Sequence, residues 1–410
     1  MHLTVWEKYA FDRRVAKTAD ISSVVIRGIM ALFHHKNDQI AISDRVLSMF
    51  WKKRVYLDHA AGVSANPSSP HEEGRHAKQM LEDARASIAR LIEVQSDDVI
   101  FTSGATESNA LAILGIPKVG DHVLYLPSAH ASIVENMKLL GERGVNVEAL
   151  PIKESRVDTE ALAKMIRPET VLVSMDAVCG ETGVVWNTRE VRQTIGPKML
   201  LHIDASQAPL TEKMTRAHFA ADLLTLDASK VGAIRGIGVL VAHRTIPITP
   251  LYRGGGQERG LRSGSEAPEL ARGFAAALGA AVRGREAFRI SATQIRRELV
   301  ESIQRNISNV QIHEGRVQVP HILNISLIGR DTDYLVALLD EAGFAVSTRS
   351  ACETDSEEGS RAVYALTGNT EWARTTLRIS WDFGVRPQEL RNFAKALAQA
   401  VTFIDSSSSG

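Results

Sequence analysis

Two ionisable residues, Asp204 and Lys230, have the types and surroundings of a chemical site. Asp204 ends an apolar run at residues 199–203, which is typical of a buried strand. Lys230 follows a second apolar run, residues 223–226, and stands 26 positions after Asp204. An amine and a carboxylate at the ends of two strands suit pyridoxal phosphate, which needs a lysine for its aldehyde and an acid beside its ring nitrogen. The alternative is that Lys230 is a solvated loop residue, so other motifs must decide.

The segment 101–109, Phe-Thr-Ser-Gly-Ala-Thr-Glu-Ser-Asn, reads as a strand, a tight turn and a helix start. The free N–H groups and the dipole of a helix N-terminus can hold a phosphate without a basic side chain, and the Thr106 hydroxyl could add a bond. The alternative is an ordinary capped helix after a strand. Because Asp204 and Lys230 end strands of the same predicted sheet, the phosphate interpretation is favoured.

Three further polar residues follow strand candidates or interrupt them. His130 follows the run 122–126, where an imidazole could stack on a planar ring and move protons. Gln207 could bind a phenolate oxygen. Arg378 is a lone cation in the strand-like run 377–381 and could bind a carboxylate through two hydrogen bonds. Each has an ordinary alternative: a loop histidine, a surface glutamine and an edge-strand salt bridge.

Cys352 lies in a Ser-Ala-Cys segment, followed by the polar, acidic run 353–360. This setting indicates a thiol outside the core, which is either accidental or reactive. Acidic neighbours disfavour a permanent thiolate. A substrate amine or an imidazole that takes the thiol proton during the reaction would offset this effect.

The order of the apolar runs predicts an α/β fold. Strand candidates alternate with helical patterns, which favours a doubly wound, largely parallel sheet whose ligands bind beyond the carboxyl ends of the strands. The strand candidates are residues 99–102, 122–126, 145–150, 171–175, 199–203, 223–226 and 238–242. Helices fit residues 72–93, 105–114, 132–143 and 158–165. Asp204, Lys230 and the turn at residues 103–104 would then meet at one edge of the sheet.

A chain of 410 residues exceeds one usual core, and we expect three parts. Residues 1–54 form an N-terminal helical extension of unknown role, with helices at 21–34 and 42–51. Residues 55–265 form a large cofactor-binding domain. Residues 266–410 comprise a linking helix at 266–304 and a small C-terminal α+β domain that carries the cysteine loop. In that domain we predict strands at 322–327, 345–347 and 377–381, and helices at 332–342 and 387–403.

Composition narrows the class of protein. The 44% hydrophobic and 23% charged residues are those of an ordinary globular protein. Because 48 basic and 48 acidic residues cancel, no global field favours nucleic acid or an acidic membrane. Two cysteines make no disulfide framework and suit a reducing compartment. The most apolar N-terminal stretch, 24–33, contains Arg27 and is too short to span a bilayer, so we expect a cytoplasmic protein.

The same motifs occur together, in this order, in the cysteine desulfurases of the class V aminotransferase superfamily, which the chain resembles from about residue 56 to residue 389. The resemblance rests on Tyr-Leu-Asp-His-Ala-Ala at 56–61, Asn-Pro-Ser-Ser at 66–69, the segments 101–109 and 202–207, Gly-Gly-Gly-Gln-Glu-Arg-Gly at 254–260, Arg-Ser-Gly-Ser at 262–265, His-Ile-Leu-Asn-Ile-Ser at 321–326 and Ser-Ala-Cys at 350–352. The spacing after Cys352 is similar to the form with a long cysteine loop. The resemblance implies the fold type I pyridoxal phosphate architecture, with a large and a smaller domain.

The resemblance also implies roles around the cofactor. Lys230 would bind pyridoxal phosphate covalently and later shuttle the α-proton of the substrate. Asp204 would pair with the ring nitrogen, His130 would stack over the ring, and Gln207 would contact the phenolic oxygen. The residues implied to hold the phosphate are Ala105, Thr106 and Ser229.

Further roles concern the substrate and the partners. Arg378 would bind the carboxylate of L-cysteine, and Cys352 would take its sulfur as a persulfide. Ser265 stands where the family uses a hydroxyl from the neighbouring subunit, which implies a homodimer. The sulfur would pass to an acceptor protein, an iron–sulfur scaffold or a tRNA-thiolation protein, with no direct nucleic-acid contact.

Several positions depart from the family pattern. Cys179 and Gly180 replace a pair of asparagines near the phenolic oxygen, and Ser229 replaces a histidine. Asp227 stands where a phosphate-binding serine is common, so its carboxylate must point away or phosphate binding weakens. A segment near the site entrance is missing between Ala61 and Asn66.

Three functions stay open from the sequence. The first is a cysteine desulfurase that gives L-alanine and an enzyme persulfide. The second is a related pyridoxal phosphate lyase or aminotransferase that acts on another amino acid, with Cys352 incidental. The third is a degenerate, non-catalytic homologue that serves as a binding subunit, which the departures at Cys179, Asp227 and Ser229 would favour.

Overall fold

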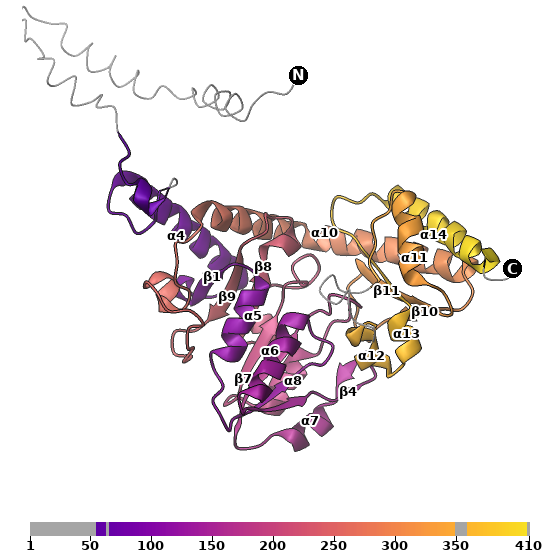
Figure 1. Cartoon of the computed structure of the whole chain (residues 1–410), viewed down its shortest axis with the longest axis horizontal. Helices are drawn as coiled ribbons and strands as arrows, with labels where there is room; N and C mark the ends of the chain where they lie inside the picture. Colours follow the sequence, from indigo (N-terminus) through magenta and orange to yellow (C-terminus); the bar gives the residue numbers. More distant parts are fainter. Residues whose placement is uncertain (1–54, 63–64, 349–358, 408–410) are drawn as a thin grey trace, which may run out of the picture. The chain divides into compact units, whose positions relative to one another are not determined.

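The computed structural model describes residues 55–62, 65–348 and 359–407 (Figure 1). The chain divides into two compact units, residues 1–59 and 60–410. The helices predicted at 21–34 and 42–51 lie outside the described residues. The fold and the site below belong to the second unit, and the boundary predicted between residues 265 and 266 stays a prediction.

A seven-stranded sheet forms the core of the second unit, in the order β1-β9-β8-β7-β6-β2-β3. The strands are β1 (Val99–Thr102), β2 (His122–Tyr125), β3 (Asn146–Ala149), β6 (Thr170–Asp176), β7 (Leu200–Asp204), β8 (Leu223–Asp227) and β9 (Gly238–Ala242). Strands β3, β2, β6, β7 and β8 run parallel, whereas β9 is antiparallel to β8 and to β1. The predicted α/β fold with a mostly parallel sheet is confirmed.

The interior of this sheet is almost fully buried, which explains its continuous apolar runs. His202 of β7 is an exception that the neighbouring strands accommodate. Its ring contacts the hydroxyl of Ser174 on β6 at 2.8 Å and that of Thr225 on β8 at 3.0 Å. Burial lowers the pKa of His202 to about 4, so the ring is neutral and the three residues form a satisfied polar row in the core.

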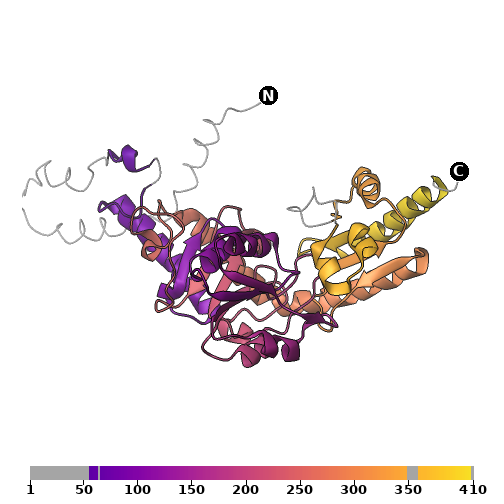
Figure 2. The same cartoon turned by 60° about the horizontal axis from the view of Figure 1, so that its bottom comes forward.

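Helices cover the sheet and link it to the C-terminal part. They are α4 (Glu72–Ile92), α5 (Ala105–Leu114), α6 (Ala131–Glu142), α7 (Thr159–Met165), α8 (Thr188–Ile195), α9 (Arg216–Phe219) and α10 (Pro268–Asn306). Helix α5 packs against α6 and against strands β8 and β9. Helix α10, 39 residues long, contacts α4 and also α14 (Pro387–Ser407), as both views show (Figures 1 and 2).

The C-terminal part contains a second, antiparallel sheet in the order β10-β11-β12. Its elements are β10 (Val310–His313), β11 (Ile322–Leu327), β12 (Thr376–Ser380), α11 (Thr332–Glu341), α12 (Arg361–Thr367), α13 (Thr370–Arg374) and α14. The strand predicted at 345–347 is wrong. Only Ser347 pairs, in an isolated bridge with Arg378, because the chain meets the outer edge of β12 at that one residue. Strand β10 and the small hairpin of β4 (Ile152–Lys153) and β5 (Arg156–Val157) were not predicted.

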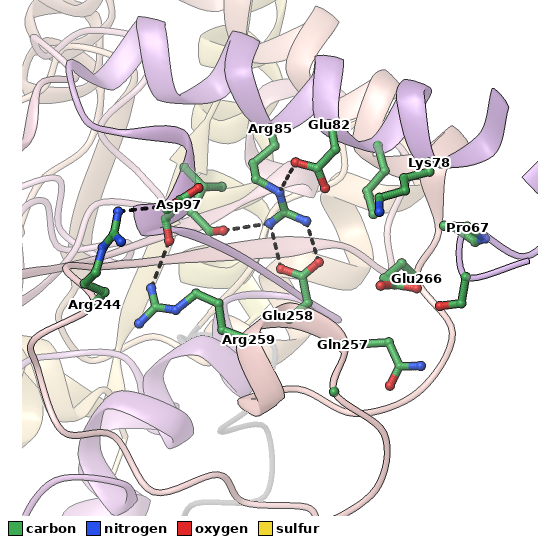
Figure 3. Close-up of a pocket in the computed structure, with 14 residues that line it drawn as sticks. Pro67, Lys78, Glu82, Arg85, Asp97, Arg244, Gln257, Glu258, Arg259 and Glu266 are labelled. Atoms are coloured by element: carbon green, nitrogen blue, oxygen red, sulfur yellow. Dashed lines mark hydrogen bonds and ion pairs between the residues drawn. The ribbon is translucent and has the colours of Figure 1, made fainter. Parts of the chain in front are cut away.

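A buried ion pair ties α4 to the glycine-rich loop that follows the sheet. Arg85 donates two hydrogen bonds of 2.7 Å to Glu258 and a third, also of 2.7 Å, to the carbonyl oxygen of Val99. The Glu258 carboxylate also accepts the backbone N–H of Phe101 at 2.8 Å. Figure 3 shows this pair among the charged side chains that line a cavity of about 690 Å³. The pair fixes the loop against the edge of the sheet at β1.

Candidate active site

A different cavity, of about 520 Å³, lies at the carboxyl ends of β6, β7 and β8. This is the edge where parallel α/β sheets bind ligands. Its walls come from these strand ends, from the first turn of α5, from the start of α6 and from β12. The lining residues are Ala105, Thr106, Ser128, His130, Ala131, Asp176, Val178, Cys179, Gly180, Glu181, Asp204, Ser206, Gln207, Asp227, Ser229, Lys230, Arg235 and Arg378.

Asp204 and Lys230 line this same cavity. Asp204 is the last residue of β7 and is 6% exposed. Its Oδ2 accepts a hydrogen bond of 2.7 Å from Asn109 Nδ2, and its Oδ1 accepts the backbone N–H of Ser206 at 2.9 Å. Lys230 follows β8 in a short 3-10 turn, η3 (Ala228–Val231), and its side chain is exposed. A held carboxylate and an accessible amine thus share one cavity.

A chain of hydrogen bonds runs from Asp204 to His130. Asn109 Nδ2 donates to Asp204 and also to Ser132 Oγ, at 2.8 Å. Ser132 Oγ and the Ser132 backbone N–H lie 2.8 and 3.2 Å from His130 Nδ1. Because Nδ1 accepts from both, a neutral ring carries its proton on Nε2. Asn109 of α5 and Ser132 of α6 have no role in the sequence prediction, because only the packing of the two helices brings them between Asp204 and His130.

The predicted phosphate residues Ala105, Thr106 and Ser229 also line the cavity. However, the Asp227 carboxylate lies among these residues and accepts hydrogen bonds from two of them. Its Oδ2 accepts the backbone N–H of Ala105 at 2.9 Å, and its Oδ1 accepts the N–H and the hydroxyl of Ser229 at 2.8 and 2.7 Å. Of the two alternatives for this position, the carboxylate does not point away, because these three donors attract it.

Gln207 and Arg378 line the cavity near Gly180. Arg378 Nη1 donates to the Gly180 carbonyl oxygen at 3.3 Å, and a Cβ built on Gly180 would lie 3.3 Å from Gln207 Nε2. A side chain at position 180 would therefore press on Gln207, as the asparagine of the family pattern would. Glycine leaves this part of the cavity open.

Among the predicted residues that the structure describes, one does not line the cavity. Ser265 lies on the loop after the sheet, where its hydroxyl accepts a hydrogen bond of 3.3 Å from Asn66 Nδ2. Cys352 lies outside the described residues. The described residues on either side of its loop are held near the cavity: Ser347 exchanges backbone hydrogen bonds with Arg378, and Ser360 donates to Glu181.

The residues of the cavity fit pyridoxal phosphate at the ring. Besides the amine and the acid, three buried polar atoms of the lining have no hydrogen-bond partner: Ser128 Oγ, Asp176 Oδ1 and Ser206 Oγ. Buried polar atoms in native proteins are paired with protein, water or a ligand, so these atoms are consistent with a polar ligand. At the phosphate end the donors are present but already bind Asp227. Among the described residues no cluster could hold a metal ion.

The model of the aminotransferase class-V family matches residues 52–393. This chain belongs to that family. The cysteine desulfurase IscS 1 of Archaeoglobus fulgidus is 32% identical over 322 residues, which cover 77% of this chain and 84% of the relative. A mitosomal cysteine desulfurase of Encephalitozoon cuniculi is 33% identical over 350 residues, 83% of this chain and 81% of the relative. The solved structure of a NifS-like protein has a TM-score of 0.77 and 27% identity, and the match covers 83% of this chain and 92% of that one.

These matches confirm the predicted resemblance to the cysteine desulfurases, the fold type I architecture and the cofactor, since class-V aminotransferases are pyridoxal phosphate enzymes. The roles assigned to individual residues of this class-V chain stay predictions.

Cys179, which stands at an asparagine position of the family, is a buried thiol. Burial raises its pKa to about 12, and the carboxyl groups of Asp176 and Glu181 add to the effect. Its Sγ lies 3.9 Å from the carbonyl oxygen of Ser128. The thiol is therefore protonated at neutral pH, a weak donor in the cavity wall rather than a nucleophile.

Asp176 is a second acid at this site, and the sequence analysis missed it. It ends β6 in register with Asp204 at the end of β7, so both side chains leave the sheet on the same face. Burial, and then the charge of Asp204, raises the pKa of Asp176 well above its ordinary value. The other charged groups that act on it are Glu181, which adds to the rise, and Arg361 of α12, which opposes it. Burial in the fold thus favours the protonated, neutral form of the Asp176 carboxyl.

We expect Asp176→Asn to stabilise the cofactor-free protein more at pH 8 than at pH 5. A carboxyl whose pKa is raised by folding contributes stability below its unfolded pKa, and this contribution is lost as the pH rises towards the folded pKa. Asparagine does not titrate, so the difference in unfolding free energy should widen by about 1 kcal/mol or more between these pH values. Urea unfolding of both proteins measures it. An equal difference at both pH values would contradict a protonated Asp176.

Proposed function

We propose that this chain is a cysteine desulfurase, which takes the sulfur of L-cysteine and releases L-alanine. The observation that carries the proposal is that Lys230, Asp204 and Arg378 line one cavity: a lysine for the cofactor, an acid for its ring and a cation for a carboxylate. The cysteine desulfurases of Archaeoglobus fulgidus and Encephalitozoon cuniculi, matched over most of this chain, support the choice of substrate.

Pyridoxal phosphate, when bound, supplies a ring that accepts the electrons of bonds broken in the substrate. Lys230 would hold it covalently, and the same amine would then carry the α-proton of the substrate. Asp204, fixed by Asn109 and Ser206, would place its carboxyl group beside the ring nitrogen. His130 would lie against the ring and exchange protons through Nε2.

The remaining cavity residues hold the cofactor and the substrate at their ends. Gln207 would donate to the phenolic oxygen, and the first turn of α5 with Ser229 would hold the phosphate. Arg378 binds the carboxylate of L-cysteine. A guanidinium has five N–H groups, so it can do this while it keeps its contact with Gly180.

Cys352 takes the sulfur atom. Its thiolate attacks the substrate sulfur, so an S–S bond forms while the substrate's C–S bond breaks. The carbon gains a proton, and the net reaction is L-cysteine plus enzyme thiol to L-alanine plus enzyme persulfide. Ser347, whose backbone pairs with Arg378 at the cavity, stands five residues before Cys352, a tether that spans at most about 17 Å. The covalent length of the chain therefore allows the thiol to reach the substrate.

We further infer a cytoplasmic homodimer that passes the sulfur to an acceptor protein, an iron–sulfur scaffold or a tRNA-thiolation protein. Ser265 does not line the cavity of its own chain, which is consistent with a hydroxyl that completes the phosphate site of a partner subunit. No helix in the part of the chain that the structure describes is long and apolar enough to cross a bilayer.

The experiment that tests this function uses purified, cofactor-loaded protein with L-cysteine and a reducing thiol. We expect L-alanine and sulfide in equal amounts, with many turnovers per chain. A panel of other amino acids should give no comparable product. A keto acid formed from one of them would instead favour the related aminotransferase or lyase, and a colourless protein that takes up no cofactor would favour the non-catalytic binding subunit.

A further inference from the structure

The phosphate end of the cavity already contains an anion, the carboxylate of Asp227. Asp227 is the last residue of β8, and its two oxygens accept three hydrogen bonds of 2.7 to 2.9 Å. The donors are the backbone N–H of Ala105 and the N–H and hydroxyl of Ser229. Both residues are among those that face the cofactor phosphate under the proposed function.

The surroundings explain why the Asp227 carboxylate lies at the start of α5. Helix α5 is ten residues long, and its first N–H groups point out of the helix with the positive end of the dipole behind them. Gly104 caps α5 with a φ of 155°, and a Cβ built on it would lie 3.3 Å from Asp227 Oδ2. The carboxylate is thus packed closely against the start of the helix, in the position that such helix ends offer to phosphate.

Asp227 also holds the turn that carries Lys230. Its Oδ1 caps η3 through the N–H of Ser229, and Lys230 is the third residue of that turn. The N–H of Ala105 and the N–H and hydroxyl of Ser229 form a phosphate cradle around this carboxylate. Moving the carboxylate out of the cradle therefore breaks the cap of the turn that positions the lysine. The two ends of the cofactor site are linked through this one side chain.

We propose that Asp227 is a specificity-determining residue for the cofactor: its carboxylate occupies the phosphate cradle of the free protein and must leave when a phosphate binds. Two anions cannot share these donors, because like charges repel at short range and each donor serves one acceptor best. The consequence is a cost on the phosphate group alone. The proposal rests on the cofactor assignment within the proposed function and is independent of the sulfur step.

The test compares two ligands, pyridoxal phosphate and pyridoxal, which differ only in the phosphate. Cofactor-free wild type, Asp227→Ser and Asp227→Asn are titrated with each, and dissociation constants are read from the absorbance of the lysine-bound ligand. The serine hydroxyl can keep the cap of η3 without the charge. We therefore expect Asp227→Ser to bind pyridoxal phosphate roughly 10-fold tighter or more, while pyridoxal binding changes by less than about 2-fold. Asp227→Asn, which keeps an acceptor for Ser229 without the charge, should also bind the phosphorylated ligand more tightly.

A second readout needs no lysine-bound ligand. Inorganic phosphate should raise the melting temperature of cofactor-free Asp227→Ser and leave that of the wild type unchanged, since only the variant offers free donors. The matched control is Asp158→Asn, which removes another capping carboxylate, one that accepts the N–H groups of Glu160 and Ala161 at 3.1 Å and lies outside the cavity lining. It should alter neither ligand's affinity.

Equal changes for both ligands, or weaker pyridoxal phosphate binding by both Asp227 variants, would overturn the proposal. If neither the wild type nor any variant bound either ligand, the cofactor assignment and the proposal on Asp227 would both fail. If both ligands bound well but no alanine formed from L-cysteine, the proposed function would fail and the inference on Asp227 would stand.

Discussion

Lys230→Ala should lose the absorbance of the lysine-bound cofactor and lower the rate of alanine formation by roughly 10³-fold or more. The substitution removes two functions at once, since the amine both holds the cofactor covalently and moves the α-proton. Because the Lys230 side chain is exposed in the cavity, its truncation leaves no hole in the core. The variant should therefore fold as well as the wild type. The measurements are an absorption spectrum after incubation with cofactor and a timed assay of alanine.

Two comparisons make this result specific. Lys164 is an exposed lysine of α7, and Lys164→Ala should keep the spectrum and retain the rate within about 2-fold. Cofactor-free Lys230→Ala should melt at the same temperature as the cofactor-free wild type. A Lys230→Ala variant that still formed the coloured complex would contradict the assignment of Lys230 as the residue that binds the cofactor.

Cys352→Ala should abolish multiple turnovers and the enzyme persulfide, while the cofactor still binds. The residues proposed to hold the cofactor do not include this thiol, so its loss should leave the spectrum unchanged. Without the thiol no group accepts the sulfur, and the C–S bond cannot be broken by this route. Mass spectrometry after a single addition of L-cysteine measures the persulfide, and the alanine assay measures turnover.

The only other cysteine of the sequence provides the control. Cys179→Ser removes a buried thiol whose pKa is about 12, so one persulfide per chain should still form and should map to Cys352. Undiminished alanine release by Cys352→Ala would point to the related lyase or aminotransferase. A persulfide on Cys179 would show that the sulfur takes a different path.

The central sheet could be predicted because its signal is local. The runs that became β6, β7 and β8 are apolar apart from Ser174, His202 and Thr225, as expected for parallel strands buried on both faces. A polar residue at the end of such a run then lies at the ligand edge by topology alone. This reasoning placed Asp204 and Lys230 in one cavity without any knowledge of side-chain contacts.

What could not be predicted depends on contacts between distant segments. Asp176 was missed because it lies just beyond the strand predicted at 171–175, and only the register of β6 with β7 places it beside Asp204. The direction of Asp227 depends on Ala105, which is 122 positions away. Strand β10 has only four residues, mostly half-buried, and its pairing with β11 decides its conformation. Sequence patterns predict most of the helices and strands, whereas the surroundings of Asp176 and Asp227 and the conformation of β10 depend on contacts in the assembled fold.

The pair of Arg85 and Glu258 has a consequence for the evolution of this chain. Loss of either partner would remove the main counter-charge of the buried ion that remains, which is costlier than replacing both together by apolar side chains. Single substitutions are therefore disfavoured at both positions, although they are 173 residues apart. We expect homologous proteins either to retain both charged residues or to have replaced both. Positions 85 of the helix and 258 of the glycine-rich loop should therefore change together.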